Sequence, residues 1–244
     1  MEYEAIDSNP AKGKRRRLRV AKPTRTYLDR ADQIESLLDA AGALDAKSRA
    51  HPGLRRAMVA MLVFAGPRLG EMLALRWRDV DLAGGTIYIA DAKTDAGVGE
   101  VSIRPALRDE LTAYKATCGS PAPSALVFPT TKGNRWGQSN VRRRVFDPAV
   151  KLACDRRAEE DLAPLPEGLT PHSMRRTFAS VLYALGEPPT VVMAEMRHTD
   201  PKLALIMYAK AMRRSPDEIQ RLRALVGVAV DSPSAVMEPA REAV

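Results

Sequence analysis

Residues 68–89 read RLGEMLALRWRDVDLAGGTIYI, and the period of the hydrophobic pattern changes within this stretch. Over residues 68–75 the apolar side chains recur at helical spacing, which predicts a short helix. Beyond Gly84 and Gly85, residues 86–89 follow the alternation of a half-buried strand, and residues 100–103 repeat it. The chain therefore changes here from helices to a small antiparallel sheet, with a hairpin predicted near residues 95–99.

Helical spacing dominates the rest of the chain. It covers residues 31–41, 54–64, 106–115, 140–154, 172–185, 189–197, 202–212 and 216–225. Pro-rich and Gly-containing stretches at residues 121–133 and 162–171 mark irregular connections. The sequence therefore predicts a mainly α fold with a small antiparallel β-sheet, an α+β class.

The composition limits the class of protein. The apolar fraction of 45% is ordinary for a globular chain, and the longest apolar run, residues 57–66, is about half of a membrane span. Cys118 and Cys154 are far apart and have no ligand pattern around them, and the chain has three histidines. We therefore expect no metal site, no cofactor, no signal peptide and no membrane partner, and a reducing cytosol as the location.

The net charge of +8 is concentrated near the N-terminus. Residues 12–25 carry eight bases, and acids and bases balance in the remainder. A basic arm of this kind suits a nucleic-acid backbone, although a solvated linker or a localisation signal has the same composition. We predict a basic linker over residues 1–25, one main domain over 26–228, and a disordered tail over 229–244.

His172 and Arg175 are spaced to share one face of a helix. Thr170 is expected to cap that helix, and Pro171 to occupy its first turn. An imidazole and a guanidinium at a helix N-terminus form a natural phosphate site. Taken alone, however, the pair is more simply explained as the start of a surface helix, because such matches arise by chance in an arginine-rich chain.

Four separated motifs together resemble the tyrosine recombinases of the phage-integrase type. The motifs are AGPRLGEMLALRW at residues 65–77 followed by DVD at 79–81, Lys93-Thr94 at the hairpin turn, the stretch 169–180 around His172 and Arg175, and MRHTDPK at 196–202 with Tyr208 ten positions after His198. They occur in the order of that family and within the expected elements. The resemblance covers about residues 9–226 and implies the catalytic-domain fold of that family.

The resemblance also implies roles for individual residues. Arg68 and Arg175 would hold the scissile phosphate, Lys93 would protonate the leaving 5′ oxygen, His172 and His198 would assist with protons and hydrogen bonds, and Tyr208 would be the nucleophile. Glu71 is expected to hold Arg68 in place, with an exposed i,i+3 pair as the alternative.

Contacts to DNA are expected from basic residues of the arm and of the motifs. These residues are Lys14, Arg15, Arg16, Arg17, Arg19, Arg176 and Arg197. A solvated role explains Arg176 equally well. Arg197 stands where members of the family commonly have glycine, so it either adds a phosphate contact or crowds the loop.

These residue types suit phosphodiester chemistry without a metal ion. Cleavage needs charge stabilisation on the equatorial oxygens, an in-line nucleophile and a proton for the leaving group. Two arginines supply forked, permanent positive charge. A tyrosine hydroxyl, with an unperturbed pKa near ~10, needs nearby cations and a histidine to favour the phenolate. The covalent phosphotyrosine keeps the energy of the phosphodiester, so a second DNA end can reverse the step.

The resemblance therefore implies a site-specific recombinase that acts on double-stranded DNA, assembles into a tetramer on it, and works in the cytoplasm in association with the nucleoid. The family usually carries an N-terminal DNA-clasping domain, and residues 2–11 resemble only its last turn. We therefore expect residues 1–25 to be the remnant of such a domain, in an excised fragment or a truncated gene. A type IB topoisomerase and a non-catalytic DNA-binding remnant remain open alternatives.

Overall fold

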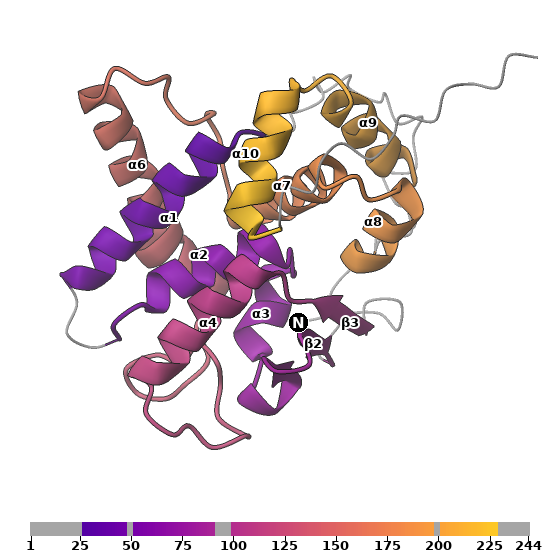
Figure 1. The fold of residues 1–244 in the computed structure, drawn as a ribbon. Helices are drawn as coiled ribbons and strands as arrows, with labels where there is room; N and C mark the ends of the chain where they lie inside the picture. The colour runs from indigo at the N-terminus through magenta and orange to yellow at the C-terminus, as the bar shows by residue number, and fades with distance from the viewer. Residues whose placement is uncertain (1–25, 48–50, 91–98, 198–200, 229–244) are drawn as a thin grey trace, which may run out of the picture.

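The computed structural model describes residues 26–47, 51–90, 99–197 and 201–228, and these are mainly helical with a three-stranded antiparallel sheet (Figure 1). The helices are α1 (Ala31–Ala46), α2 (Leu54–Phe64), α3 (Leu69–Ala74), η2 (Trp77–Asp79), α4 (Pro105–Thr117), α5 (Gln138–Val141), η4 (Arg142–Phe146), α6 (Asp147–Glu159), α7 (Pro171–Ala184), α8 (Pro189–Met196), α9 (Pro201–Ala211) and α10 (Pro216–Val226). The expected fold class is confirmed. No helix of the described ranges is long and apolar enough to cross a membrane.

Helices α2 and α7 form the centre of the molecule. Nearly every residue of both helices is buried, and α2 packs against α1, α4 and α7, while α7 also contacts α8, α9 and α10. Burial of nearly the whole surface of both helices places them inside the domain. Because α2 ends just before the first arginine motif and α7 begins with the second, this central pair brings the two motifs to one region.

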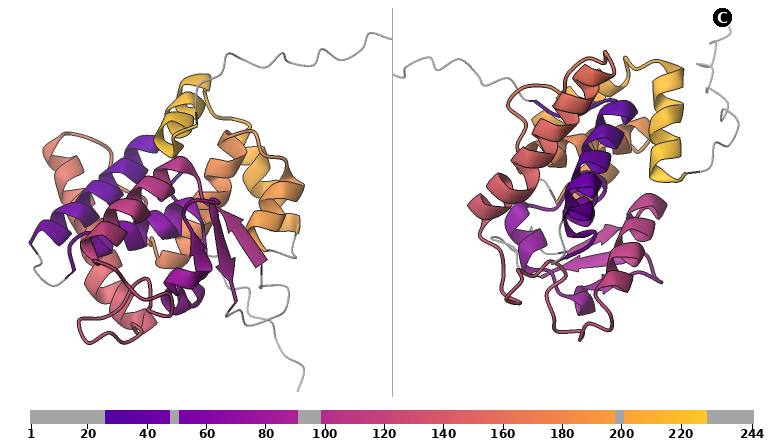
Figure 2. Two further views of the ribbon diagram at one scale, coloured as in Figure 1. Left: turned by 60° about the horizontal axis from the view of Figure 1, so that its bottom comes forward. Right: turned by 90° about the vertical axis from the view of Figure 1, so that its left-hand side faces the viewer.

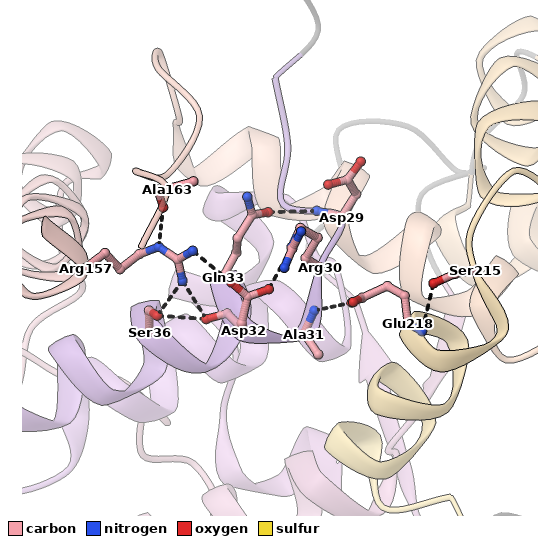
Figure 3. A network of polar contacts seen from close by, with 10 residues as sticks. All are labelled: Asp29, Arg30, Ala31, Asp32, Gln33, Ser36, Arg157, Ala163, Ser215 and Glu218. Atoms are coloured by element: carbon pink, nitrogen blue, oxygen red, sulfur yellow. Dashed lines mark hydrogen bonds and ion pairs between the residues drawn. The ribbon is translucent and has the colours of Figure 1, made fainter. Parts of the chain in front are cut away.

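Polar contacts tie the start of α1 to two other helices (Figure 3). The buried Arg157 of α6 pairs with Asp32 at 2.8 Å and donates to the Ser36 Oγ at 2.9 Å. On the other side, Glu218 of α10 accepts a 2.7 Å hydrogen bond from the Ala31 amide. A buried charge is tolerated only when it is paired and hydrogen-bonded, so these contacts hold α1 between α6 and α10.

The sheet lies beside α3 and α8, with strand order β1 (Val80–Asp81), β2 (Thr86–Ile89) and β3 (Gly99–Ser102) (Figure 2). Its alternation follows the sequence pattern, because Ile87, Ile89 and Val101 point into the core while Tyr88 is exposed. Residues 91–98, which include most of the predicted hairpin turn, lie outside the described residues. The sheet thus joins the helical body at the edge nearest the first arginine motif.

The helix expected at residues 140–154 is longer and less regular than predicted. It begins with α5 at Gln138, passes through the π-helical turn η4 and ends with α6 at Glu159. Pro148 has no N–H to donate to the Arg144 carbonyl, and its ring crowds that oxygen. The missing i to i−4 hydrogen bond accounts for the π-helical turn that precedes Pro148.

Candidate active site

A glycine turn brings the first arginine motif against α7. Gly66 has a φ of +59°, which favours glycine, and a Cβ there would lie 2.4 Å from a ring carbon of Phe178. The absence of a side chain lets α7 approach the turn closely. Arg68 follows as the N-cap of α3, with extended backbone, and its side chain is 39% exposed.

Arg175 is buried behind this turn. Its side chain is 2% exposed, Nη1 donates to the Gly66 carbonyl at 2.6 Å, and Nη2 donates to the carbonyl of Met196. Burial, followed by the charges of Arg68 and Arg197, lowers the pKa of Arg175 to about 10, and Glu71 opposes the shift. Arg175 therefore remains charged at neutral pH and joins the first arginine motif to the end of α8.

Glu71 lies at the centre of the arginine cluster. Its Oε1 accepts from Arg68 Nη1 at 2.7 Å, and its Oε2 accepts from the Arg68 backbone N at 2.9 Å. Burial alone would raise the pKa of Glu71, but the hydrogen bonds from Arg68 and the charges of Arg197 and Arg68 outweigh burial and lower the pKa. The pair expected from the sequence is present, with Glu71 buried and not on an exposed helix face.

Arg197 also contacts Glu71, from the end of α8. Its Nη2 lies 2.6 Å from Oε2 of Glu71, and its side chain is 5% exposed. The backbone of Arg197 is left-handed, with φ 50° and ψ 51°, a conformation that glycine adopts at far lower cost. The structure thus places this side chain inside the cluster, away from the surface where a direct DNA contact would form.

His172 occupies the first turn of α7. Thr170 caps this helix as predicted, because its hydroxyl accepts from the Ser173 amide at 3.2 Å, and Pro171 is the first helical residue. Part of the imidazole faces solvent. The protein around the rest of the ring, followed by the charges of Arg176, Arg175 and Arg68, lowers the pKa of His172. The lowered pKa favours the neutral form of His172 at pH 7.

Arg68 and His172 face a common pocket of about 600 Å³. Glu71 also lines this pocket, as do Arg135, Gln138, Ser139 and Arg142. Arg135 also donates to the Gly70 carbonyl at 2.5 Å, which holds its loop against α3. The pocket is rich in groups that bind oxyanions, and neither Arg175 nor Tyr208 lines it. A second pocket of about 700 Å³ near Tyr88 contains neither Arg68 nor His172.

The sequence patterns predict only a connection and a helix in this region, and no functional role for Arg135, Gln138, Ser139 and Arg142. The three consecutive arginines at residues 142–144, just inside a helix start, were a signal for an anion-binding surface. The pairing of this segment with the first arginine motif, however, depends on how α5 packs against α3.

Tyr208 lies on α9, half-buried against α7. Its ring meets the ring of Tyr183 edge-on, with centroids 5.5 Å apart. Two residues later, Lys210 pairs with Asp29 at 2.8 Å and lies 4.5 Å above the ring of Tyr27. These contacts anchor α9 to α7 and to the segment that precedes α1 (Figure 1).

Several predicted site residues lie outside the described residues. They are Lys93 and His198, and from the basic arm Lys14, Arg15, Arg16, Arg17 and Arg19. Arg176 is half-buried and close enough to His172 for its charge to act on the imidazole. Within the described ranges, no group of three or more His, Cys, Asp or Glu side chains is placed to hold a metal ion.

Comparison with known proteins assigns this chain to a family. The model of the phage integrase family matches residues 29–215. The chain therefore belongs to the phage integrase family, the tyrosine recombinases.

Among curated relatives, the chain is 26% identical over 235 residues to a prophage phiRv2 integrase of Mycobacterium tuberculosis, covering 90% of this chain and 56% of that protein. An integrase/recombinase of Escherichia coli is 27% identical over 184 residues, covering 63% of this chain and 54% of that protein. The tyrosine recombinase XerC of Xanthomonas axonopodis pv. citri is 32% identical over 132 residues, covering 52% and 38%. The chain spans about half the length of the first two relatives.

Solved structures share the fold. The Tn1549 transposon integrase in complex with transposon right end DNA aligns with a TM-score of 0.63 at 19% identity, covering 91% of this chain and 73% of that one. The XerA recombinase aligns with a TM-score of 0.59 at 20% identity, covering 83% and 64%. The helical body with its small sheet is therefore the tyrosine-recombinase catalytic-domain fold.

Proposed function

We propose that residues 26–228 form the catalytic domain of a site-specific recombinase, which breaks and rejoins DNA strands through a covalent 3′-phosphotyrosine at Tyr208. The observation that carries the proposal is the pocket that Arg68, Glu71 and His172 line, with the buried Arg175 close enough for the charge of Arg68 to act on it. Family membership supports the same reaction class.

The arginines supply charge stabilisation in this proposal. Arg68 is half-exposed and held by Glu71, so its remaining N–H groups can reach a phosphate in the pocket. Preorganised donors of this kind are worth on the order of 3 kcal/mol each in rate. Arg175 uses one N–H of Nη1 and one of Nη2 for backbone carbonyls, and its Nε has no partner among the described residues, so N–H groups remain for a phosphate oxygen.

The covalent step transfers the phosphoryl group from one oxygen to another. The Tyr208 oxygen forms a bond to phosphorus, the bond to the 5′ oxygen breaks, and Lys93 gives that oxygen a proton. The lowered pKa of His172 favours its neutral imidazole, which can accept a hydrogen bond or the tyrosine proton. In the second step, a 5′ hydroxyl of another strand attacks the phosphotyrosine and restores the tyrosine.

The partner in this proposal is double-stranded DNA, bound by the basic arm and by Arg176 beside the pocket. The Tn1549 integrase, which has the same fold, was solved with DNA. Rejoining two duplexes requires several active sites, so we propose that the protein acts as a tetramer on DNA, in association with the nucleoid. Arg197, whose side chain is buried, has a different role.

Trapping of a covalent adduct tests the proposal without knowledge of the target site. The 244-residue chain is incubated with a pool of nicked random duplexes, in which the cleaved strand loses a short fragment and cannot be resealed. Protein–DNA adducts are isolated after denaturation, the DNA is sequenced, and the modified peptide is mapped by mass spectrometry. We expect a 3′-phosphotyrosyl adduct at Tyr208 that forms in excess EDTA.

The alternatives give different results. DNA binding without any adduct would identify a non-catalytic DNA-binding protein and contradict the proposal. Relaxation of supercoiled plasmid, with no strand exchange between recovered sites, would identify a type IB topoisomerase. An adduct on Tyr88, Tyr114 or Tyr183 would contradict the assignment of the nucleophile.

A further inference from the structure

Arg197 combines two unfavourable features in one residue. Its backbone is left-handed, one of only two such non-glycine residues in the described part of the chain, the other being Asp161. Its guanidinium is buried, and Nε and Nη1 have no hydrogen-bond partner among the described residues. A strained backbone and a buried charge at one position persist only where the surrounding structure holds them in place.

The contact that holds Arg197 is made to Glu71, at 2.6 Å. The two carboxylate oxygens of Glu71 bind different arginines. Oε1 accepts a 2.7 Å hydrogen bond from Arg68 Nη1, and Oε2 accepts from Arg197 Nη2 and from the Arg68 backbone N. Without Arg197, the carboxylate and the Arg68 guanidinium would form a neutral pair. With Arg197 present, the same group carries one net positive charge.

We propose that Arg197 is a positioning residue for Arg68: by binding the second oxygen of Glu71, it offsets the carboxylate charge and leaves Arg68 facing the pocket with uncompensated positive charge for an oxyanion. This inference rests on the proposed function, because the oxyanion that it serves is the scissile phosphate.

The location of the charges supports this role. Arg68 is 39% exposed, whereas the side chains of Arg197 and Glu71 are 5% and 3% exposed, so only Arg68 of the three presents its charge freely to the pocket. Charges interact more strongly where water is excluded, and a buried counter-ion weakens an anion site unless a second cation neutralises it. Burial lowers the pKa of Arg197, and the charge of Arg68 adds to this shift while Glu71 opposes it.

The test measures the affinity of the full chain for inorganic phosphate, by calorimetry or phosphorus NMR at pH 7 and low ionic strength. Arg68→Gln defines the binding that does not belong to the pocket. We expect Arg197→Gly and Arg197→Gln to weaken pocket binding roughly five- to tenfold, the effect of one unit charge acting through partly hydrated protein. Arg197→Lys should stay within about twofold of the wild type.

A double variant separates charge from structure. In Arg197→Gly with Glu71→Gln, one cation and one anion are lost together, so the net charge around Arg68 returns to that of the wild type. We therefore expect phosphate affinity to recover. A purely structural role predicts that the double variant binds more weakly than Arg197→Gly. Asp161→Gly, at the other left-handed position, controls for the relief of backbone strain and should leave affinity unchanged.

Unchanged phosphate affinity in both Arg197→Gly and Arg197→Gln, or a double variant weaker than Arg197→Gly, overturns the inference. The adduct assay on the same wild-type preparation keeps the two proposals distinct. Absence of any adduct contradicts the proposed function. Adduct formation together with unchanged phosphate affinity in both Arg197→Gly and Arg197→Gln contradicts only the role of Arg197.

Discussion

The Nη1 atom of Arg175 donates a 2.6 Å hydrogen bond to the carbonyl oxygen of Gly66, a residue 109 positions earlier in the chain. Together with its contact to the Met196 carbonyl, this bond makes Arg175 a buried junction between α7, the turn before α3 and the end of α8. The arginine expected at the phosphate is thus also a structural element of the site. The two functions depend on the same close packing of the Gly66 turn against α7.

We predict that Gly66→Ala lowers the free energy of unfolding by about 2–5 kcal/mol. The left-handed backbone accounts for about 1–2 kcal/mol, and the 2.4 Å approach of the new Cβ to Phe178 adds an overpacking cost of about 1–3 kcal/mol. Urea unfolding measures the change. Gly119→Ala is the matched control, because Gly119 has a φ of +71° and nothing within 4 Å of the position of an added Cβ. This variant should lose only the part of the unfolding free energy that the left-handed backbone accounts for. Equal losses in the two variants would show that the contact with Phe178 is unimportant.

Tyr208→Phe is expected to abolish the trapped adduct while DNA binding, measured by gel shift, stays within about twofold, since the hydroxyl is the only group lost. Tyr183→Phe is the matched control, because it removes a hydroxyl from the ring that lies edge-on to Tyr208. Burial, followed by the neighbouring Tyr208, raises the pKa of Tyr183, which disfavours its phenolate at neutral pH. An adduct that survives Tyr208→Phe and disappears in Tyr183→Phe would identify Tyr183, and not Tyr208, as the nucleophile.

The pKa of His172 should lie below that of a free histidine, because burial and three nearby arginines disfavour the imidazolium. Proton titration followed by NMR measures it. Arg176→Gln should raise the pKa part of the way to its ordinary value, since Arg176 is the largest of the charge contributions while burial remains. An unchanged pKa in Arg176→Gln would contradict the electrostatic account.

The same shift makes folding stability depend on pH. The folded protein binds fewer protons at His172 than the unfolded chain in the window below about pH 6.5, so stability rises with pH through that window and is lost as the pH falls. Replacement of His172 by Asn should flatten this part of the urea-unfolding profile. A profile with the same slope in both proteins would show that His172 does not contribute.

Removal of residues 12–25 should reduce the salt dependence of DNA binding. These residues hold eight bases in a chain that is otherwise neutral by count, and each phosphate contact contributes roughly −0.9 to the slope of log affinity against log salt concentration. We therefore expect the slope to flatten by several units in fluorescence anisotropy titrations over a salt series. A variant with the eight bases replaced by Gln separates charge from length, and a slope unchanged by either alteration would mean that the arm does not contact DNA.

The elements of the fold could be predicted because their patterns are local. Helix α2 matches its predicted range, and the inward positions of Ile87, Ile89 and Val101 follow from a two-residue alternation. Side chains three or four residues apart on a helix, or two apart on a strand, necessarily share a face. The cap of α7 by Thr170 is equally local, since it depends on residues within one turn.

The sequence by itself thus determined the class of fold, the family to which the chain belongs and the residue types available for chemistry. Tertiary structure alone decided that Arg175 holds the carbonyls of Gly66 and Met196 and that Arg197 points inward to Glu71. It also decided that Arg135, Gln138, Ser139 and Arg142 line the same pocket as Arg68 and His172. Every residue has a carbonyl, so sequence cannot mark which carbonyl a distant guanidinium will meet. The direction of Arg197 depends on a left-handed residue at the end of α8, which the packing of α8 against β3 and α7 holds in place.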